Sequence, residues 1–261
     1  MQNRLMLIMI LVGVLLSGKI QAFTAEALTI GEVITLQYPS AVLQQNRTIK
    51  VYLPQDYDKS IQTYPTLYLL DGERHLAHAV LASRLHQELG NIPRQIIVAI
   101  NNLEQDGARE NDFYHQKDKF AQFIGTELQP FIDKTFRSSK SATLYGHSLA
   151  AYFAVDLLAK QPALFDRYIA ASPPLQRHVN ELYQQLVSSR TPTAVKRLYI
   201  SLAPLGEEGE AVFSAYQQFI GLLSAKTPDN VRWHEQVMAE QSHISNYYIS
   251  FFNGISAVFA D

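Results

Sequence analysis

Strand-like and helix-like segments alternate along almost the whole chain. Short runs that suit strands occupy residues 47–54, 64–72, 94–102, 141–146, 165–173, 195–204 and 230–238. Segments with apolar residues at helical spacing separate most of them, at residues 75–89, 118–136, 149–162, 179–189, 211–225 and 244–260. This alternation predicts an α/β fold, in which a mostly parallel central sheet carries helices on both faces.

The composition suits one globular domain. The 261-residue chain has no internal repeat, low-complexity tract or long linker, so we expect a single domain over residues 23–261. Hydrophobic residues make up 47% of the chain, enough for a sizeable core. The formal net charge of −2 and the lack of a basic run argue against a nucleic-acid partner. Without cysteine the chain forms no disulfide and carries no lipidation site of the bacterial lipoprotein type.

The first 22 residues predict a secretory signal peptide. Arg4 precedes an apolar run over residues 5–16, which is too short to span a bilayer comfortably, and a short polar stretch then ends at Ala22. Cleavage after Ala22 is favoured, and the small residues Ala25 and Ala27 offer a later alternative. An uncleaved membrane anchor is the competing interpretation. We therefore expect a periplasmic or secreted protein with no stable membrane insertion after cleavage.

A serine stands between two small residues where a strand should turn into a helix. The segment Gly146-His147-Ser148-Leu149-Ala150 differs from the nucleophile-elbow pattern G-x-S-x-G only by alanine at the last position. At such an elbow the strand and the helix nearly touch, so the flanking residues must be small. The alternative is a serine in an ordinary strand-to-helix turn.

Candidates for a base and an acid follow Ser148 in the chain order that α/β-hydrolases use. A serine hydroxyl needs a base within hydrogen-bond reach, and the base needs an acid to orient it. His243 follows the last predicted strand in a polar loop, and a glutamate cluster follows the strand before it. We favour Glu208 as the acid, with Glu207 second and Glu210 third because a helix should begin near it. The cluster could instead be a solvated helix N-terminus, where negative charge is favourable.

Two backbone amides are candidates for the oxyanion hole, which must stabilise the negative oxygen of a tetrahedral intermediate. One is the amide of Leu149, directly after the serine and at a helix start. The other is the amide of Glu73, which follows Asp71 and Gly72 at the end of a predicted strand. We expect Gly72 to let that backbone approach the substrate.

The remaining histidines are interpreted more simply. His75 and His78 lack nearby third and fourth ligands, so we expect packing roles and no metal site. His147 is interpreted as a filler of the elbow motif whose ring points away from the catalytic base. His115 and His178 are candidates for lining the cleft. No pattern in the sequence calls for a cofactor.

Four blocks of the chain resemble an esterase family of α/β-hydrolases that includes enterochelin and related siderophore esterases, esterase D-type enzymes, feruloyl esterases and mycolyltransferases. The blocks are residues 51–78, 92–100, 123–175 and 240–255, and the resemblance extends over roughly residues 29–259. It implies an α/β-hydrolase fold without a large lid and a serine hydrolase mechanism. It also implies Ser148 as nucleophile, His243 as base, an acid at Glu207 or Glu208, and an oxyanion loop at residues 71–73.

The chain departs from that family at three places. Ala150 replaces the usual glycine, residues 172–178 (SPPLQRH) lack a tryptophan that many members carry, and residues 108–115 (ARENDFYH) do not match the usual segment. We expect the last two to shape the substrate pocket. Among the family's members, the pattern is most similar to the secreted siderophore esterases.

The sequence therefore predicts a periplasmic or secreted serine carboxylesterase that acts on a small-molecule ester, with a siderophore ester as the candidate substrate. An acyltransferase on the same scaffold would use the same residues, and a non-catalytic binding protein on a hydrolase fold is a third possibility. The sequence carries no signal for an oligomeric state or for individual substrate-binding residues.

Overall fold

A computed structural model describes residues 31–188 and 194–260. The predicted signal peptide at residues 1–22 and both of its possible cleavage sites lie outside this part of the chain. Among the described residues, no helix combines the length and the apolar character needed to cross a membrane.

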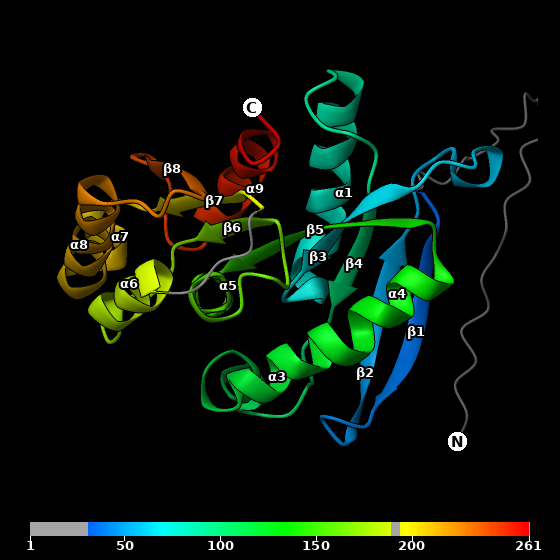
Figure 1. Cartoon of the computed structure of the whole chain (residues 1–261), viewed down its shortest axis with the longest axis horizontal. Helices are drawn as coiled ribbons and strands as arrows, with labels where there is room; N and C mark the ends of the chain where they lie inside the picture. The colour runs from blue at the N-terminus through cyan, green and yellow to red at the C-terminus, as the bar shows by residue number, and fades with distance from the viewer. Residues whose placement is uncertain (1–30, 189–193, 261) are drawn as a thin grey trace, which may run out of the picture.

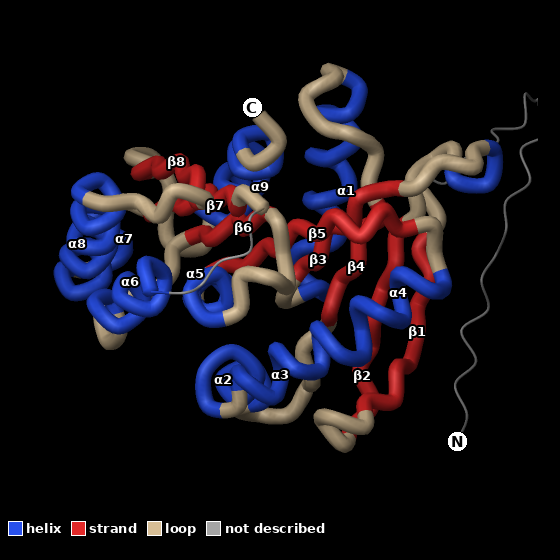
Figure 2. The backbone as a smooth tube through the Cα atoms, viewed as in Figure 1, coloured by secondary structure: helices blue, strands red, loops and turns tan. Residues whose placement is uncertain are grey.

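One eight-stranded sheet forms the centre of the described chain, in the order β1-β2-β4-β3-β5-β6-β7-β8 (Figures 1 and 2). The strands are β1 (Val33–Ser40), β2 (Gln45–Tyr52), β3 (Tyr64–Leu69), β4 (Ile96–Ile100), β5 (Ser138–His147), β6 (Arg167–Ala171), β7 (Lys196–Leu202) and β8 (Val231–Val237). The pairs β1–β2 and β2–β4 are antiparallel, and every other neighbouring pair is parallel. The predicted α/β fold is confirmed, with β1 as a strand that the sequence analysis missed.

Helices cover both faces of the sheet, with α1 and α9 on one face and α3, α4, α5, α6 and α8 on the other (Figure 1). The longer helices are α1 (Gly72–Glu88), α3 (Lys117–Phe123), α4 (Gln129–Thr135), α5 (Leu149–Lys160), α6 (Val179–Ser188), α8 (Glu210–Ala225) and α9 (Asn246–Ala257). Short elements are η1 (Tyr57–Lys59), α2 (Ala108–Glu110), η2 (Asn111–His115), η3 (Ile124–Leu128) and α7 (Leu205–Glu208).

The two faces of the sheet bury two separate apolar layers. In β4, Ile97 and Ala99 pack into the layer beneath α1 and α9. Ile96, Val98 and Ile100 pack into the layer on the opposite face. Successive side chains of a strand point to opposite faces, so a strand covered on both sides needs a continuous apolar run rather than alternation. This explains why the predicted buried strands read as unbroken apolar segments.

The predicted single helix over residues 118–136 is instead three consecutive segments. The α-helical turns of α3 and α4 are separated by η3, a stretch of wider π-helical turns. Pro130 lies just beyond η3 and has no backbone N–H to donate to the carbonyl four residues earlier. The apolar spacing of the segment survives the interruption, because Phe123, Ile124 and Leu128 are all buried.

The parallel arrangement decides where a site can form. The carboxyl ends of parallel strands meet at one edge of a sheet, where ligands bind in folds of this type. The loops after β3, β5, β7 and β8 all leave from this edge, and they carry Asp71, Ser148, Glu208 and His243.

Candidate active site

Ser148 lies on a sharp turn between β5 and α5. Its backbone has φ 57° and ψ −125°, a combination that residues other than glycine rarely adopt. A Cβ atom on Gly146 would lie 2.4 Å from the carbonyl oxygen of Ala150, so only glycine fits there. Ala150 itself is fully buried, which shows that its extra methyl group is accommodated. These are the features of a nucleophile elbow, with the serine held in a strained conformation.

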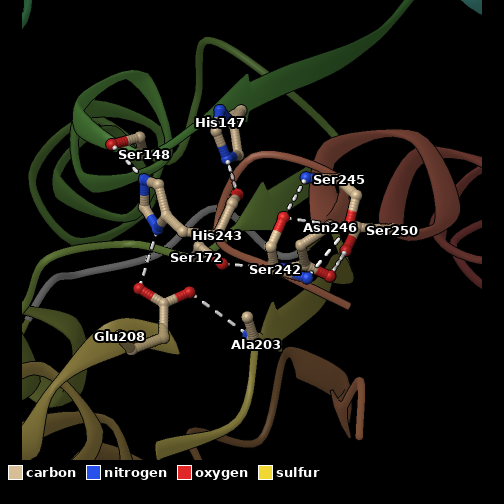
Figure 3. Close-up of polar contacts among 10 residues, drawn as sticks. All are labelled: His147, Ser148, Ser172, Ala203, Glu208, Ser242, His243, Ser245, Asn246 and Ser250. Carbon is tan, nitrogen blue, oxygen red and sulfur yellow. Dashed lines mark hydrogen bonds and ion pairs between the residues drawn. The ribbon is translucent and has the colours of Figure 1, made fainter. Parts of the chain in front are cut away.

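Ser148, His243 and Glu208 form one continuous chain of hydrogen bonds, although they come from three loops (Figure 3). The Nε2 atom of His243 lies 3.1 Å from the Oγ atom of Ser148. The Nδ1 atom of His243 lies 2.8 Å from Oε2 of Glu208. This is the arrangement in which Nδ1–H donates to the carboxylate and Nε2 is free to accept the proton of the serine.

Of the three candidate acids, the structure brings only Glu208 to the histidine. Glu208 ends the short helix α7, and its side chain is only 2% exposed. Glu207 is exposed, and Glu210 begins α8, where its carboxylate accepts a hydrogen bond from Ser214 at 3.1 Å. Adjacent residues in one helical turn point in different directions, so Glu207 and Glu208 cannot both face His243.

The environment of Glu208 favours its charged form. Burial alone would raise the pKa of this carboxyl, but hydrogen bonds from His243 and Ser172 outweigh that effect and lower the pKa. The backbone amide of Ala203 contributes in the same direction, donating to Oε1 at 3.2 Å. Glu208 is therefore held as a carboxylate that can stabilise a protonated His243.

His147 has a different position from the one expected for a motif filler. Its ring packs against the ring of His243 with centroids 5.0 Å apart, and its Nε2–H donates to the carbonyl oxygen of His243 at 2.8 Å (Figure 3). The expectation that this ring points away from the base is wrong. Burial lowers the pKa of His147 to about 4, so the imidazole is neutral and its single N–H fastens the His243 loop to the end of β5.

Both candidate oxyanion amides lie in the first turn of a helix. Leu149 is the first residue of α5, and Glu73 is the second residue of α1. Amides in a first turn have no acceptor within their own helix, so they are available to a ligand. Asp71 and the elbow are joined by Arg109, whose guanidinium donates to the Asp71 carboxylate at 2.7 and 3.0 Å and to the carbonyl oxygen of His147 at 3.1 Å. This bridge, which the sequence analysis missed, keeps the two helix starts together.

Glycine is needed at position 72 for a structural reason that differs from the one we expected. A Cβ atom there would lie 2.7 Å from the carbonyl carbon of Ala99 and 2.8 Å from the nitrogen of Ile100. Gly72 therefore allows the start of α1 to pack directly on the backbone of β4. The close approach that the structure shows is to the sheet.

A cavity of about 290 Å³ lies next to the elbow. Leu149 and Tyr152 of α5 form one side of it, and the rest of its wall consists of Glu110, Tyr114, His115, Pro174, Gln176, Arg177 and His178. Most of this wall comes from the two segments that depart from the family pattern, residues 108–115 and 172–178. The rings of Tyr114, Tyr152 and His178 pack with centroids 5.7 to 6.0 Å apart. The cavity thus has an aromatic wall and a charged rim.

Buried His75 and half-buried His78 form a pair beneath the site. His75 Nδ1 lies 2.9 Å from His78 Nε2, and both rings contact Tyr145 and Tyr247. The structure thus gives both histidines packing roles. In residues 31–188 and 194–260, no three His, Cys, Asp or Glu side chains are arranged so that they could hold a metal ion.

The mostly parallel sheet, the serine elbow and the histidine and carboxylate at neighbouring strand ends define the class of protein, which is the α/β-hydrolases. Residues 40–247 match the protein family described as "Putative esterase". The match covers most of the chain, and the chain belongs to this family.

Individual relatives are distant in sequence. The chain is 28% identical to the Bacillus subtilis protein named "Uncharacterized protein YjcH" over 163 residues, which are 59% of this chain and 67% of that protein. It is 26% identical to the ferri-bacillibactin esterase BesA of Bacillus subtilis over 159 residues, which are 50% of this chain and 55% of BesA. The match therefore spans only about half of the length of BesA.

Solved structures share the fold over nearly the whole chain. An IroE-like serine hydrolase from Shewanella oneidensis superposes with a TM-score of 0.77 at 23% identity, covering 87% of this chain and 80% of that one. The BES protein from Bacillus cereus gives a TM-score of 0.77 at 21% identity, covering 91% and 99%. At this level of identity the likeness concerns the fold.

Proposed function

We propose that the protein is a serine carboxylesterase in which Ser148 is the nucleophile, His243 the general base and Glu208 the orienting acid. The observation that carries this proposal is the unbroken hydrogen-bond chain from Ser148 to Glu208, which starts at a strained elbow. Family membership supports the same chemistry.

In the first half of the reaction, His243 Nε2 takes the proton of the Ser148 hydroxyl while Oγ attacks the carbonyl carbon of the ester. The carbonyl oxygen becomes negative, and the amides of Leu149 and Glu73 donate hydrogen bonds to it. The tetrahedral intermediate then collapses, the bond from carbon to the alcohol oxygen breaks, and His243 returns its proton to the leaving alkoxide. Glu208 stabilises the imidazolium that exists between these two proton transfers.

In the second half, a water molecule attacks the acyl group on Ser148, with His243 again accepting a proton. The acid is released and the serine recovers its proton from the histidine. With 35% of its side chain exposed, His243 is accessible to that water. An alcohol in place of water would turn the same site into an acyltransferase.

A siderophore ester is the substrate that we propose. Support comes from two relatives, BesA and the siderophore enterobactin esterase of Emericella nidulans, to which the chain is 38% identical over 73 residues. The aromatic wall of the cavity, formed by Tyr114 and Tyr152, suits a ligand that carries aryl groups. We also propose a periplasmic or secreted location, which the apolar run before Ala22 supports.

The test combines active-site labelling with product analysis. A fluorophosphonate probe is expected to label the wild type and Ser139→Ala, which changes an exposed serine of β5, but not Ser148→Ala. Labelling of Ser148→Ala would show that another residue is the nucleophile. The purified protein is then assayed with p-nitrophenyl esters, enterobactin and ferri-bacillibactin, each with and without glycerol. Hydrolysis without transfer to glycerol supports the esterase, whereas glycerol esters as the main product would establish the acyltransferase.

A further inference from the structure

Four polar residues behind the candidate acid are completely buried. Ser172 follows β6, Ser201 lies in β7, and Asn246 and Ser250 lie one turn apart on α9; each is 0% exposed. Buried polar groups are costly unless they are hydrogen-bonded, and these four are bonded to one another in sequence. The contacts are 2.6 Å from Asn246 to Ser172 and 2.7 Å from Ser250 to Asn246 (Figure 3). A further contact of 2.5 Å joins Ser201 to Ser250.

The direction of the hydrogen bonds in this chain follows from the chemistry of the groups. The amide nitrogen of Asn246 can only donate, and it faces the Oγ atom of Ser172. The amide oxygen of Asn246 can only accept, so Ser250 must donate its hydroxyl proton to it. Ser250 has no second proton, and Ser201 must therefore be the donor in their mutual contact. Every donor in the chain thus points toward Ser172.

Ser172 extends this series of donors toward the candidate acid, Glu208. Because Ser172 accepts from Asn246, its own proton remains free to donate, and an interaction with Ser172 is one of those that lower the pKa of the Glu208 carboxyl. The backbone of Ser172 has φ 51°, a left-handed conformation that is unfavourable for serine, and its amide donates to the carbonyl oxygen of Ser201 at 2.8 Å. Strained buried residues of this kind cluster at functional sites, where the surrounding structure maintains them.

We propose that Ser172 and Asn246 are positioning residues of the esterase site, and that the one-directional chain from Ser201 to Ser172 holds the Glu208 carboxylate in line with His243. This inference rests on the proposed function. The amide of Ala203 lies 3.2 Å from one carboxylate oxygen and Nδ1 of His243 lies 2.8 Å from the other, and Ser172 favours the charged form of the same group. Asn246 begins α9 only three residues after His243, so the same amide also anchors the loop that carries the base.

Substitutions at Ser172 separate the hydroxyl from the backbone. Ser172→Ala removes the hydroxyl and keeps the strained conformation, whereas Ser172→Gly removes it and relieves the strain. Both are expected to lower kcat by about tenfold to a hundredfold, the loss that corresponds to one hydrogen bond to a charged group. KM should stay within about twofold, because Ser172 does not reach the substrate. A purely structural role would instead leave the kcat of both variants close to that of the wild type wherever they are folded.

Asn246→Asp tests the direction of the hydrogen-bond chain, because aspartate has almost the same shape as asparagine. When the new carboxyl group at position 246 is ionised it can only accept, so it takes the proton of Ser172 away from Glu208 and adds a second negative charge. When it is protonated, it can still donate to Ser172 and restores the original pattern. The ratio of variant to wild-type kcat should therefore fall as the pH rises. Asn253→Asp, on the same helix and hydrogen-bonded to Gln236, is the matched control and should show no such trend.

The experiment measures p-nitrophenyl acetate hydrolysis and fluorophosphonate labelling between pH 6 and 9, at temperatures where circular dichroism shows each variant to be folded. The proposal requires the loss of kcat in both Ser172 variants and the pH trend in Asn246→Asp alone. If the wild type is active and the variants at Ser172 and Asn246 are unaffected, or if Asn253→Asp shows the same pH trend as Asn246→Asp, the positioning role is refuted. The proposed esterase function would not be affected by either result. A wild type that neither labels nor hydrolyses refutes the esterase, and the positioning role falls with it.

Discussion

Replacing His78 with phenylalanine should make the fold less sensitive to acid. His75, His78 and His147 are packed beneath the candidate site, and burial lowers their pKa values to about 2, about 4 and about 4 from the usual 6.5. For His75 the neighbouring histidines lower the pKa further. The folded protein therefore keeps all three rings neutral at a pH where the unfolded chain already binds protons.

The sign and size of the effect follow from these values. Between pH 6.5 and pH 4 the unfolded chain holds a proton at position 78 that the folded chain does not, so the free energy of unfolding falls as the pH falls through this window. The slope is about 1.4 kcal/mol per pH unit where the difference is one full proton. From pH 7 to pH 5, His78 alone should remove about 2 kcal/mol of stability. Above pH 6.5 both states are neutral and the contribution is constant.

Urea unfolding followed by circular dichroism at pH 7, 6 and 5 measures this directly. The loss of unfolding free energy between pH 7 and 5 should be about 2 kcal/mol smaller in His78→Phe than in the wild type. Phenylalanine fits the aromatic surroundings of Tyr247, Tyr248 and Phe251, whose rings contact His78. His115→Phe, at an exposed position, is the control and should follow the wild type. If wild type and His78→Phe lose the same stability, the buried rings do not carry the acid sensitivity.

Three further predictions concern the site and the chain terminus. Glu208→Gln should lower kcat by about 10⁴-fold with the fold intact, as loss of the orienting acid does in well-studied triads. The kcat of Glu207→Gln and Glu210→Gln should stay within about tenfold of the wild-type value, and ester turnover of the three variants measures this. Gly146→Ala should destabilise the protein by about 1–3 kcal/mol, because the new methyl group meets backbone atoms of α5, and a lowered melting temperature would show it. Mass spectrometry of the exported protein should find a chain that begins near Phe23, and an intact Met1 on a soluble cytoplasmic protein would contradict the signal peptide.

The fold was largely predictable because a sheet buried on both faces leaves a strong apolar signal. β1 lacks this continuous apolar run, because its residues alternate between exposed and partly buried positions as an antiparallel strand at a sheet edge allows, and it was missed. The interruption of the helix at residues 124–128 has no effect on apolar spacing, so the sequence pattern could not reveal it. The same limit hid α7, which is too short to show a period.

At the site, the sequence could predict residues whose position follows from strand ends, and not residues whose role depends on distant partners. Ser148, His243 and the glutamate cluster each follow a strand, so topology alone brings them together. Whether Glu207 or Glu208 faces the histidine depends on one helical turn, and only the structure distinguishes them. Arg109 was missed because the Asp71 carboxylate that it binds lies 38 positions away in the sequence.

The buried hydroxyl groups were missed for the same reason. Ser172 and Asn246 are separated by 74 positions, and neither stands in a pattern that suggests a polar contact. His147 shows the opposite error, because a residue inside a recognised motif was interpreted from the motif alone. Its hydrogen bond reaches a carbonyl 96 positions away, which no local pattern contains.

The cavity wall has a consequence for how such a protein can change over time. Residues 110–115 and 174–178 supply most of the wall, whereas the three side chains proposed for chemistry stand on the loops after β5, β7 and β8. In the proposed esterase, substrate preference and reaction chemistry are thus encoded in separate stretches of sequence. A lineage could exchange the two wall segments and acquire a new substrate while the loops with Ser148, Glu208 and His243 stayed the same. Relatives that share all three residues can therefore differ in what they cleave, and the wall segments are the better guide to that difference.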